Sequence, residues 1–487
     1  MKRLLIILTL VIAHCSLVFA APADSAKVAK RAAAVSHLKQ HFKPYGFIRN
    51  YFTYDSRECI AGTGDLYFYM PKDENWNKTD DPELREDLNA QSTFRFLSLT
   101  TRVGLNIVGY KWGNTEFSGK IEADFYAAIS AKSSTDVKQT HAVTGTAQFR
   151  LRQAYVALGW DSLPMLGGKD FARVDLTLGQ TWHPMAADLC DVIALNSGAP
   201  FGPFNRSPQV RMDARLGKFV TLTAAGLWQM QYNSIGPDGQ SAEYIAYAKT
   251  PEAYLGLSFH DKGFLMRVGA DVLSIKPRHQ GNALTGTSLT DTIIGTNGKA
   301  LQVTVKDRIT TASPFLYLQY KKGEFSIKAK TIFAESGEHM NMNGGYGVSK
   351  VNADGSYEYT PTRTSSSWIS LVYGGKVGKQ ETKHPQKLQG ILFAGYVENL
   401  GTKEALATNA NGSLVGFYYP RVKNMNRMWR LTPTLLYTVG KFQVGMEYDI
   451  TSVHYGDGKI DPTNGLSKNG LHWVTNHRAQ VMVKYNF

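Results

Sequence analysis

Residues 478–487 have the sequence RAQVMVKYNF, in which an apolar set of side chains alternates with a largely polar set. A β-strand with this period of two presents one apolar face and one polar face. Soluble antiparallel sheets alternate in the same way, so the pattern alone does not identify the environment. The aromatic side chain of Phe487 and the many similar segments upstream favour a transmembrane β-barrel of the bacterial outer membrane.

The first twenty residues carry the features of a secretory signal peptide. Lys2 and Arg3 precede an apolar run from Leu4 to Ala13, and small residues up to Ala20 provide a cleavage site. We expect a signal peptide over residues 1–20, a short periplasmic segment over 21–43 and a transmembrane barrel over 44–487. The exported product is therefore predicted to lie in the outer membrane of a Gram-negative bacterium.

The composition narrows the class of protein. The chain has 487 residues and a formal net charge of +14, and its mean hydropathy is −0.26. After the signal segment no apolar run approaches the ~20 residues of a membrane helix, so a membrane-spanning chain must cross by strands. The basic balance favours anionic partners, which for an exported protein means small anions or acidic glycolipid and not nucleic acid.

Cysteine and histidine give no strong site. Cys59 and Cys190 can pair in an oxidising compartment, and two unpaired thiols are an equal alternative. His37 and His41 lie one helical turn apart, but two histidines alone make an incomplete metal site. We therefore predict no metal and no other cofactor.

Strand-like segments alternate with turns and loops through the rest of the chain. About sixteen strands are expected, an even number as in bacterial barrels. They are Tyr45–Tyr54, Thr93–Tyr110, Glu116–Ile129, Thr146–Trp160, Ala172–Thr181, Pro208–Leu216, Lys218–Tyr232, Ala253–His260, Gly263–Ile275, Lys306–Tyr320, Glu324–Ala334, Arg363–Val377, Gln386–Glu398, Arg427–Val439, Lys441–His454 and His472–Phe487. Tight turns at Gly217, Gly263, Gly323 and Gly440 join some pairs, and long polar stretches join others. This asymmetry predicts short periplasmic turns and long extracellular loops.

Charged residues recur on one face of the expected strands. Arg150 and Arg152 lie two residues apart in mid-strand, and a midplane arginine that faces lipid costs about 2–4 kcal/mol. A dry core would also be costly for so many charges, so we expect them to line an aqueous lumen, with some of them paired across neighbouring strands. A soluble β-sandwich or propeller is the alternative, but it leaves the long charged strands unexplained. The expected pore-lining residues are Arg102, Lys120, Glu122, Asp124, Arg150, Arg152, Arg211, Asp213, Arg215, Lys328, Lys330, Arg430, Glu447, Asp449 and Arg478.

Several motifs in the first half of the chain resemble one family of porins. They are YGFIR at 45–49, KIEADFY at 120–126, FRLRQAYV at 149–156, LGQTW at 178–182 and SPQVR at 207–211. In this order they look like successive strands of DcaP-like trimeric outer-membrane porins, over roughly residues 45–232. The resemblance implies a sixteen-stranded homotrimer that admits small, often anionic solutes such as dicarboxylates. The short segment before the first strand departs from relatives with a long periplasmic coiled coil, so it does not support trimer stabilisation by such a segment.

The same resemblance implies that residues 183–206 fold into the lumen as a constriction loop. Prolines and glycines in this segment disfavour regular structure, and a surface loop is the alternative. The expected constriction-loop residues are His183, Asp188, Asp191 and Arg206.

These patterns predict an outer-membrane porin that lets small hydrophilic solutes diffuse passively. A mild preference for anions is expected because the inward basic residues outnumber the acidic ones. A non-conducting adhesin or structural barrel is the first alternative. A membrane-embedded hydrolase is the second, but the sequence has no Gly-x-Ser-x-Gly elbow and no local Ser/His pairing at a strand end, so no catalytic residue is predicted.

Overall fold

The computed structural model describes residues 40–62, 67–98, 100–126, 148–161, 171–287, 291–378 and 384–487. The predicted signal peptide, most of the predicted periplasmic segment and the stretch 127–147 lie outside these ranges. Within them, no helix combines the length and the apolar character needed to span a bilayer.

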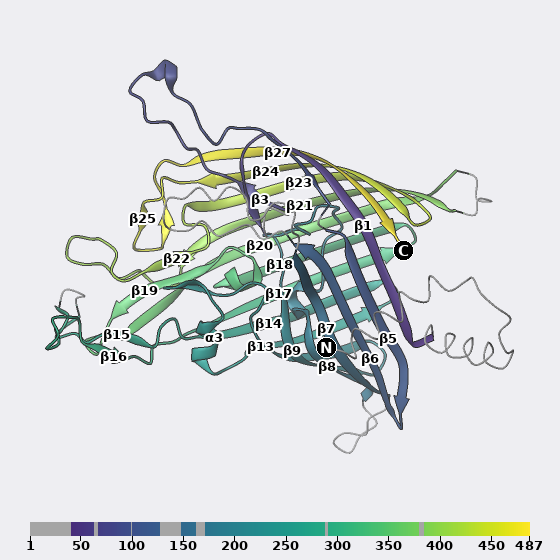
Figure 1. Cartoon of the computed structure of the whole chain (residues 1–487), viewed down its shortest axis with the longest axis horizontal. Coiled ribbons are helices and arrows are strands. Elements are labelled where there is room, and N and C mark those ends of the chain that lie inside the picture. Colours follow the sequence, from purple (N-terminus) through teal and green to yellow (C-terminus); the bar gives the residue numbers. More distant parts are fainter. Residues whose placement is uncertain are drawn as a thin grey trace, which may run out of the picture.

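The described chain forms a closed antiparallel barrel of sixteen wall strands (Figure 1). The wall strands are β1 (Phe42–Asp55), β4 (Thr93–Leu97) continued by β5 (Arg102–Trp112), β6 (Thr115–Tyr126), β7 (Gln148–Asp161), β8 (Phe171–Trp182), β9 (Arg206–Leu216), β10 (Val220–Leu227), β13 (Glu252–Asp261), β14 (Phe264–Ile275), β17 (Ile309–Lys322), β18 (Phe325–Glu335), β20 (Tyr357–Val377), β21 (Gln386–Thr402), β23 (Met425–Val439), β24 (Phe442–Tyr455) and β27 (His472–Asn486). The first and last of them close the barrel, with Phe47 opposite Asn486 and Asp55 opposite Arg478. The predicted fold and strand number are confirmed.

Shorter elements lie in the connections. They are β2 (Cys59–Gly62), β3 (Tyr67–Pro71), η1 (Pro82–Leu84), η2 (Pro184–Ala186), β11 (Ile235–Gly236), β12 (Gly239–Gln240), α3 (Glu243–Ala248), β15 (Gln280–Asn282), β16 (Gln302–Thr304), η4 (Gly337–Met340), β19 (Gly345–Val351), β22 (Tyr418–Pro420), β25 (Ile460–Asp461) and β26 (Leu466–Ser467). Several predicted boundaries were wrong, and two of them change the course of the wall. The predicted strand Thr93–Tyr110 is divided into β4 and β5, which both pair with β1, and the predicted strand Lys218–Tyr232 leaves the wall after Leu227.

The two ends of the barrel differ, as predicted. Tight turns join β9 to β10 and β23 to β24, where Gly217 and Gly440 adopt φ values of 60° and 55° that favour glycine. The long connections meet at the opposite end, and Figure 1 shows β15, β16, β19 and β25 there, away from the C-terminus. Short periplasmic turns and long extracellular loops produce this arrangement in outer-membrane barrels.

The outer face of the wall is apolar. Phe149, Met446 and Leu435 are 63, 58 and 49% exposed. Exposed apolar residues spread over many strands would be costly in water, but they match the hydrocarbon region of a bilayer. The strand period of two then places the intervening polar residues on the inner face.

One strand departs from the simple alternation predicted for it. Gln153 lies opposite Glu122, but Leu151 lies opposite the next residue, Ala123, so Arg152 is the extra residue of a β-bulge in β7. Gln153 and Arg152 both contact the Glu122 carboxylate, at 3.2 and 3.0 Å, and hence face inward together. Because the bulge reverses the alternation beyond it, Val156 lies on the outer face, where it is 51% exposed.

Candidate functional site

Arginines from β5 and β7 share two carboxylates of β6, the strand between them, on the inner face. Arg150 donates to both oxygens of Asp124, at 2.8 and 2.9 Å. Arg152 contacts Asp124 at 2.6 Å and Glu122 at 3.0 Å, and Arg102 lies 3.5 Å from Glu122. We call these three arginines and two carboxylates the arginine cluster. Its three cations outnumber its two anions, so the cluster carries an excess positive charge.

Further cations without a carboxylate partner lie on the inner face. The Arg49 guanidinium and the Lys484 ammonium lie 4.8 and 4.6 Å from the centre of the Phe47 ring. Arg206 packs 4.9 Å from the centre of the Trp182 ring, and its Nη1 has no hydrogen-bond partner among the described residues. None of these three cations forms an ion pair with a described carboxylate, so they add to the positive potential of the interior.

Arg211 and Arg215, the remaining predicted cations of β9, border a cavity. Arg211 and Arg215 line a cavity of about 520 Å³, together with Asp213 on the same strand. Arg267 of β14 also lines this cavity, and it pairs with Asp188 at 2.6 Å. This cavity lies between the barrel wall and the segment that follows β8.

That segment, residues 183–205, runs through the barrel interior. The Tyr51 hydroxyl on β1 donates to the Ile193 carbonyl at 2.5 Å. Glu447 on β24 accepts from the Ile193 amide at 2.9 Å, and Ser366 on β20 donates to the Phe201 carbonyl at 2.7 Å. Because these partners lie on wall strands far from β8, the segment crosses the barrel.

The four predicted constriction-loop residues occupy different places. Asp188 and Asp191 pair with the wall cations Arg267 and Lys328, at 2.6 and 2.7 Å. His183 is fully buried, and Arg206 begins β9. The structure thus places the two acidic residues against the wall, and their role in restricting solutes stays a prediction.

A second infolded segment, around β3, was not predicted. Phe68, Tyr69 and Met70 are buried inside the barrel. Arg430 donates to the Tyr69 carbonyl at 2.7 Å, and the Arg478 guanidinium lies 4.7 Å from the centre of the Phe68 ring. The aromatic run YFYM at residues 67–70, inside an otherwise polar loop, is the sequence signal that identifies it.

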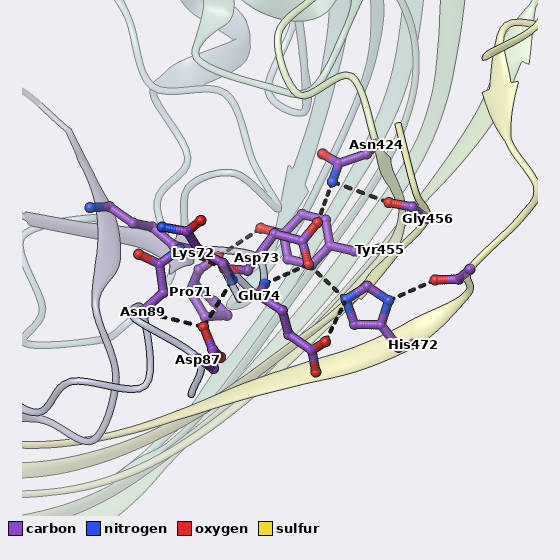
Figure 2. A network of polar contacts seen from close by, with 12 residues as sticks. Pro71, Lys72, Asp73, Glu74, Asp87, Asn89, Asn424, Tyr455, Gly456 and His472 are labelled. Atoms are coloured by element: carbon purple, nitrogen blue, oxygen red, sulfur yellow. Dashed lines mark hydrogen bonds and ion pairs between the residues drawn. The ribbon is translucent and has the colours of Figure 1, made fainter. Parts of the chain in front are cut away.

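The end of this segment is fastened to the extracellular rim (Figure 2). The Tyr455 hydroxyl donates to the Pro71 carbonyl at 2.6 Å. Asp73 lies between two further rim residues, accepting from the Asn424 amide at 2.5 Å and lying 2.7 Å from Nε2 of His472. The chain therefore enters the barrel from a fixed point on β24 and β27.

A third infolded segment contains η4. The Phe204 amide donates to the Met340 carbonyl at 2.9 Å, and the Asn205 side chain donates to the His339 carbonyl at 2.8 Å. The Tyr69 hydroxyl donates to the Asn341 carbonyl at 3.1 Å. The three infolded segments therefore contact one another as well as the wall.

Several predicted pore-lining residues lie beneath these segments. They are on the inner face as predicted from the alternation, but each is at most 6% exposed. Lys330 donates to the Met185 carbonyl, and Arg430 donates to the Ala199 carbonyl at 3.0 Å. The covered residues are Lys330, Arg430, Glu447, Asp449 and Arg478.

The cysteine alternative left open by the sequence is resolved. Cys59 and Cys190 are both buried and unpaired. Burial raises the pKa of the Cys190 thiol, so this side chain acts as a small apolar group in the infolded segment.

Comparisons with known proteins extend the resemblance at the level of the fold. No protein-family model and no curated protein matches the chain. Among solved structures, the outer membrane channel DcaP of Acinetobacter baumannii is similar, with a TM-score of 0.57 and 17% sequence identity over 92% of this chain and 97% of that chain. An anion-selective porin from Comamonas acidovorans has a TM-score of 0.42 and 9% identity over 92% of this chain and 99% of that chain. With its apolar outer wall, the chain thus has the fold of the DcaP channel and is a protein of the Gram-negative outer membrane.

Proposed function

We propose that this protein is a porin through which small hydrophilic solutes diffuse passively, with a preference for anions. The observation that carries the proposal is the excess of cations on the inner wall of β1 and β5–β9. Similarity to the DcaP channel supports the porin fold, and the charges of this chain support the anion preference.

The inner cations suit carboxylate solutes in particular. The guanidinium group presents a planar fork of donors that matches a carboxylate, and a low-dielectric wall focuses its field into the lumen. The side chains of Arg102, Arg150 and Arg211 are 21, 23 and 25% exposed, so part of each guanidinium is open to the interior space. Donors separated along the wall favour dicarboxylates over monocarboxylates, because each end of the solute then meets its own cation.

The route that we propose runs between the infolded segments and the wall formed by β5–β14. The 520 Å³ cavity beside Arg211 and Arg215 is part of this route. The covered side of the wall holds the infolded segments in place. A cleaved signal peptide over residues 1–20, a periplasmic segment over 21–43 and assembly into a homotrimer in contact with outer-membrane lipids belong to the same proposal.

Single-channel recording in a salt gradient tests this function. The reversal potential should have the sign that corresponds to anion permeation, and dicarboxylates should reduce the chloride current by competing for the arginines. A clear cation preference would refute the anion selectivity.

A non-conducting barrel is the second candidate, and the extensive interior packing of the three segments favours it. Liposome swelling separates the two candidates. Vesicles that contain the folded protein should swell in small sugars and in dicarboxylate salts under the porin proposal, and they should behave like protein-free vesicles under the alternative.

A further inference from the structure

Four polar side chains meet in a sealed place inside the barrel, between two infolded segments and the wall. His183 follows β8, Glu252 begins β13, Asp271 lies in β14 and His339 lies in η4. Each side chain is at most 1% exposed. One donor atom from each of His183, Glu252 and Asp271 lies within 4.8 Å of the other two. Two carboxylates in such a place require compensating positive charge.

The partners of the outer ring nitrogens distinguish the two histidines. Nδ1 of His183 accepts from the Met185 amide at 3.1 Å, which places the proton of a neutral ring on Nε2, where it reaches Glu252 at 2.7 Å. Nδ1 of His339 lies 3.0 Å from the Ser336 carbonyl and must donate to it. In a neutral ring, Nε2 of His339 then presents a lone pair toward the carboxylates. A backbone carbonyl on the opposite nitrogen is the usual support of a metal-binding histidine.

The distances around His339 fit metal ligands better than hydrogen bonds. Nε2 lies 3.5 Å from Oε1 of Glu252 and 3.5 Å from Oδ2 of Asp271. Two ligands at zinc distances of about 2.0–2.1 Å, in tetrahedral geometry, lie about 3.4 Å apart. Nε2 of His339, Oε2 of Glu252 and Oδ1 of Asp271 are buried without a hydrogen-bond partner among the described residues.

We propose that this cluster binds a divalent transition-metal cation, with zinc as the best-matched ion. Nε2 of His339 and the carboxylates of Glu252 and Asp271 are the ligands, and one of the unpartnered carboxylate oxygens completes a four-coordinate site. His183 positions Glu252 through its hydrogen bond. One dication neutralises both carboxylates, and this set of nitrogen and oxygen donors suits zinc.

A cation bound at this site would fasten the infolded segment that contains η4 to the barrel wall. Its ligands come from η4 and from two adjacent wall strands, and His183 belongs to the segment that crosses the barrel. A bound cation therefore holds two infolded segments against β13 and β14, and its removal should loosen both.

The wild-type protein provides the primary test. The full-length chain, folded in detergent, is stripped with a chelator, loaded with zinc and separated from unbound metal. About one zinc per chain should remain, and cobalt in its place should give the visible absorption of a four-coordinate nitrogen and oxygen site. A chain that retains no zinc and gives no cobalt spectrum would show that the four residues form an ion-pair network only, which would overturn the proposal.

Variants assign the ligands. His339→Ala and Asp271→Asn should each abolish zinc retention, whereas His183→Gln should keep a site with affinity lowered by about 10–100-fold, because only the support of Glu252 changes. His279→Ala, in a loop where the imidazole ring lies 4.7 Å from the Tyr247 ring, is the matched control and should retain zinc. Equal retention by His339→Ala and His279→Ala would overturn the assignment. If a variant does not fold, as judged by circular dichroism, the cobalt spectrum of the wild type still decides.

Discussion

The arginines on opposite sides of this barrel occupy equivalent positions in their strands but have different surroundings. The side chain of Arg150 on β7 is 23% exposed, and it shares Asp124 with another arginine. The side chain of Arg430 on β23 is 1% exposed and is covered by backbone carbonyls from two infolded segments. An inward-facing charge can therefore line the solute path or bind an infolded segment that narrows this path. The alternation along the strand is the same in both cases and does not distinguish them.

Substitution of Arg430 should have the largest effect on stability. Arg430→Ala leaves Asp449 buried without its cation and leaves the Tyr69 and Ala199 carbonyls unpaired, so we expect a loss of about 3–5 kcal/mol in unfolding free energy. Denaturant unfolding in detergent measures this loss. The matched control is Arg427→Ala on the same strand, whose half-exposed pair with Glu398 should contribute at most ~1 kcal/mol. Similar losses in the two variants would contradict the distinction between the two sides.

Loss of the rim attachment of the β3 segment should lower the stability less than loss of Arg430, which is buried against the same segment. Tyr455→Phe removes the donor to the Pro71 carbonyl and should lower the unfolding free energy by about 1 kcal/mol. Limited proteolysis of the loop between β1 and β4 should become faster, because the segment is released at one end. Tyr373→Phe, on the exposed outer face, is the control and should leave the proteolysis rate unchanged.

Substitution in the arginine cluster should change selectivity more than stability. Arg102→Gln removes one cation, while Glu122 keeps Arg152, so no carboxylate is left unpaired. One charge 4–8 Å from a solute in water contributes about 0.5–1 kcal/mol, which predicts a two- to fivefold fall in the anion-to-cation permeability ratio. Reversal potentials in a salt gradient measure this ratio. Arg85→Gln, in an exposed loop beside Trp76, should leave it unchanged, and an unchanged ratio in Arg102→Gln would remove the arginine cluster from the solute path.

The smallest effect is expected at an exposed pair between β19 and the extracellular end of β20. Lys350 and Glu358 lie 2.8 Å apart but are 62% and 55% exposed, so solvent screens their attraction. Lys350→Ala should change the unfolding free energy by less than ~0.5 kcal/mol. A larger loss would show that exposure alone does not separate structural from surface charges in this protein.

The wall strands were predictable because each carries its own signal. The alternation around Arg211 and Asp213 predicts which side chains of β9 face inward. Gly217, which has a positive φ, marks the turn between β9 and β10. The bulge at Arg152 was not predictable, because one extra residue changes the face of everything beyond it without changing the composition.

The interior was only partly predictable. Residues 183–206 were expected inside the barrel from a resemblance to known porins, whereas the β3 segment was not expected, although its aromatic run was visible in the sequence. The metal-binding cluster joins residues 183, 252, 271 and 339, and no local pattern connects positions so far apart.

The amino-acid sequence by itself determined a sixteen-stranded membrane barrel with a charged inner face, because strand period, turn residues and the cost of charge in lipid all act locally. The tertiary structure alone decided which of the inner charges contact water and which contact the infolded segments. That choice depends on where loops of some twenty residues or more find hydrogen-bond partners once the barrel has closed, and those partners come from strands distant in the sequence.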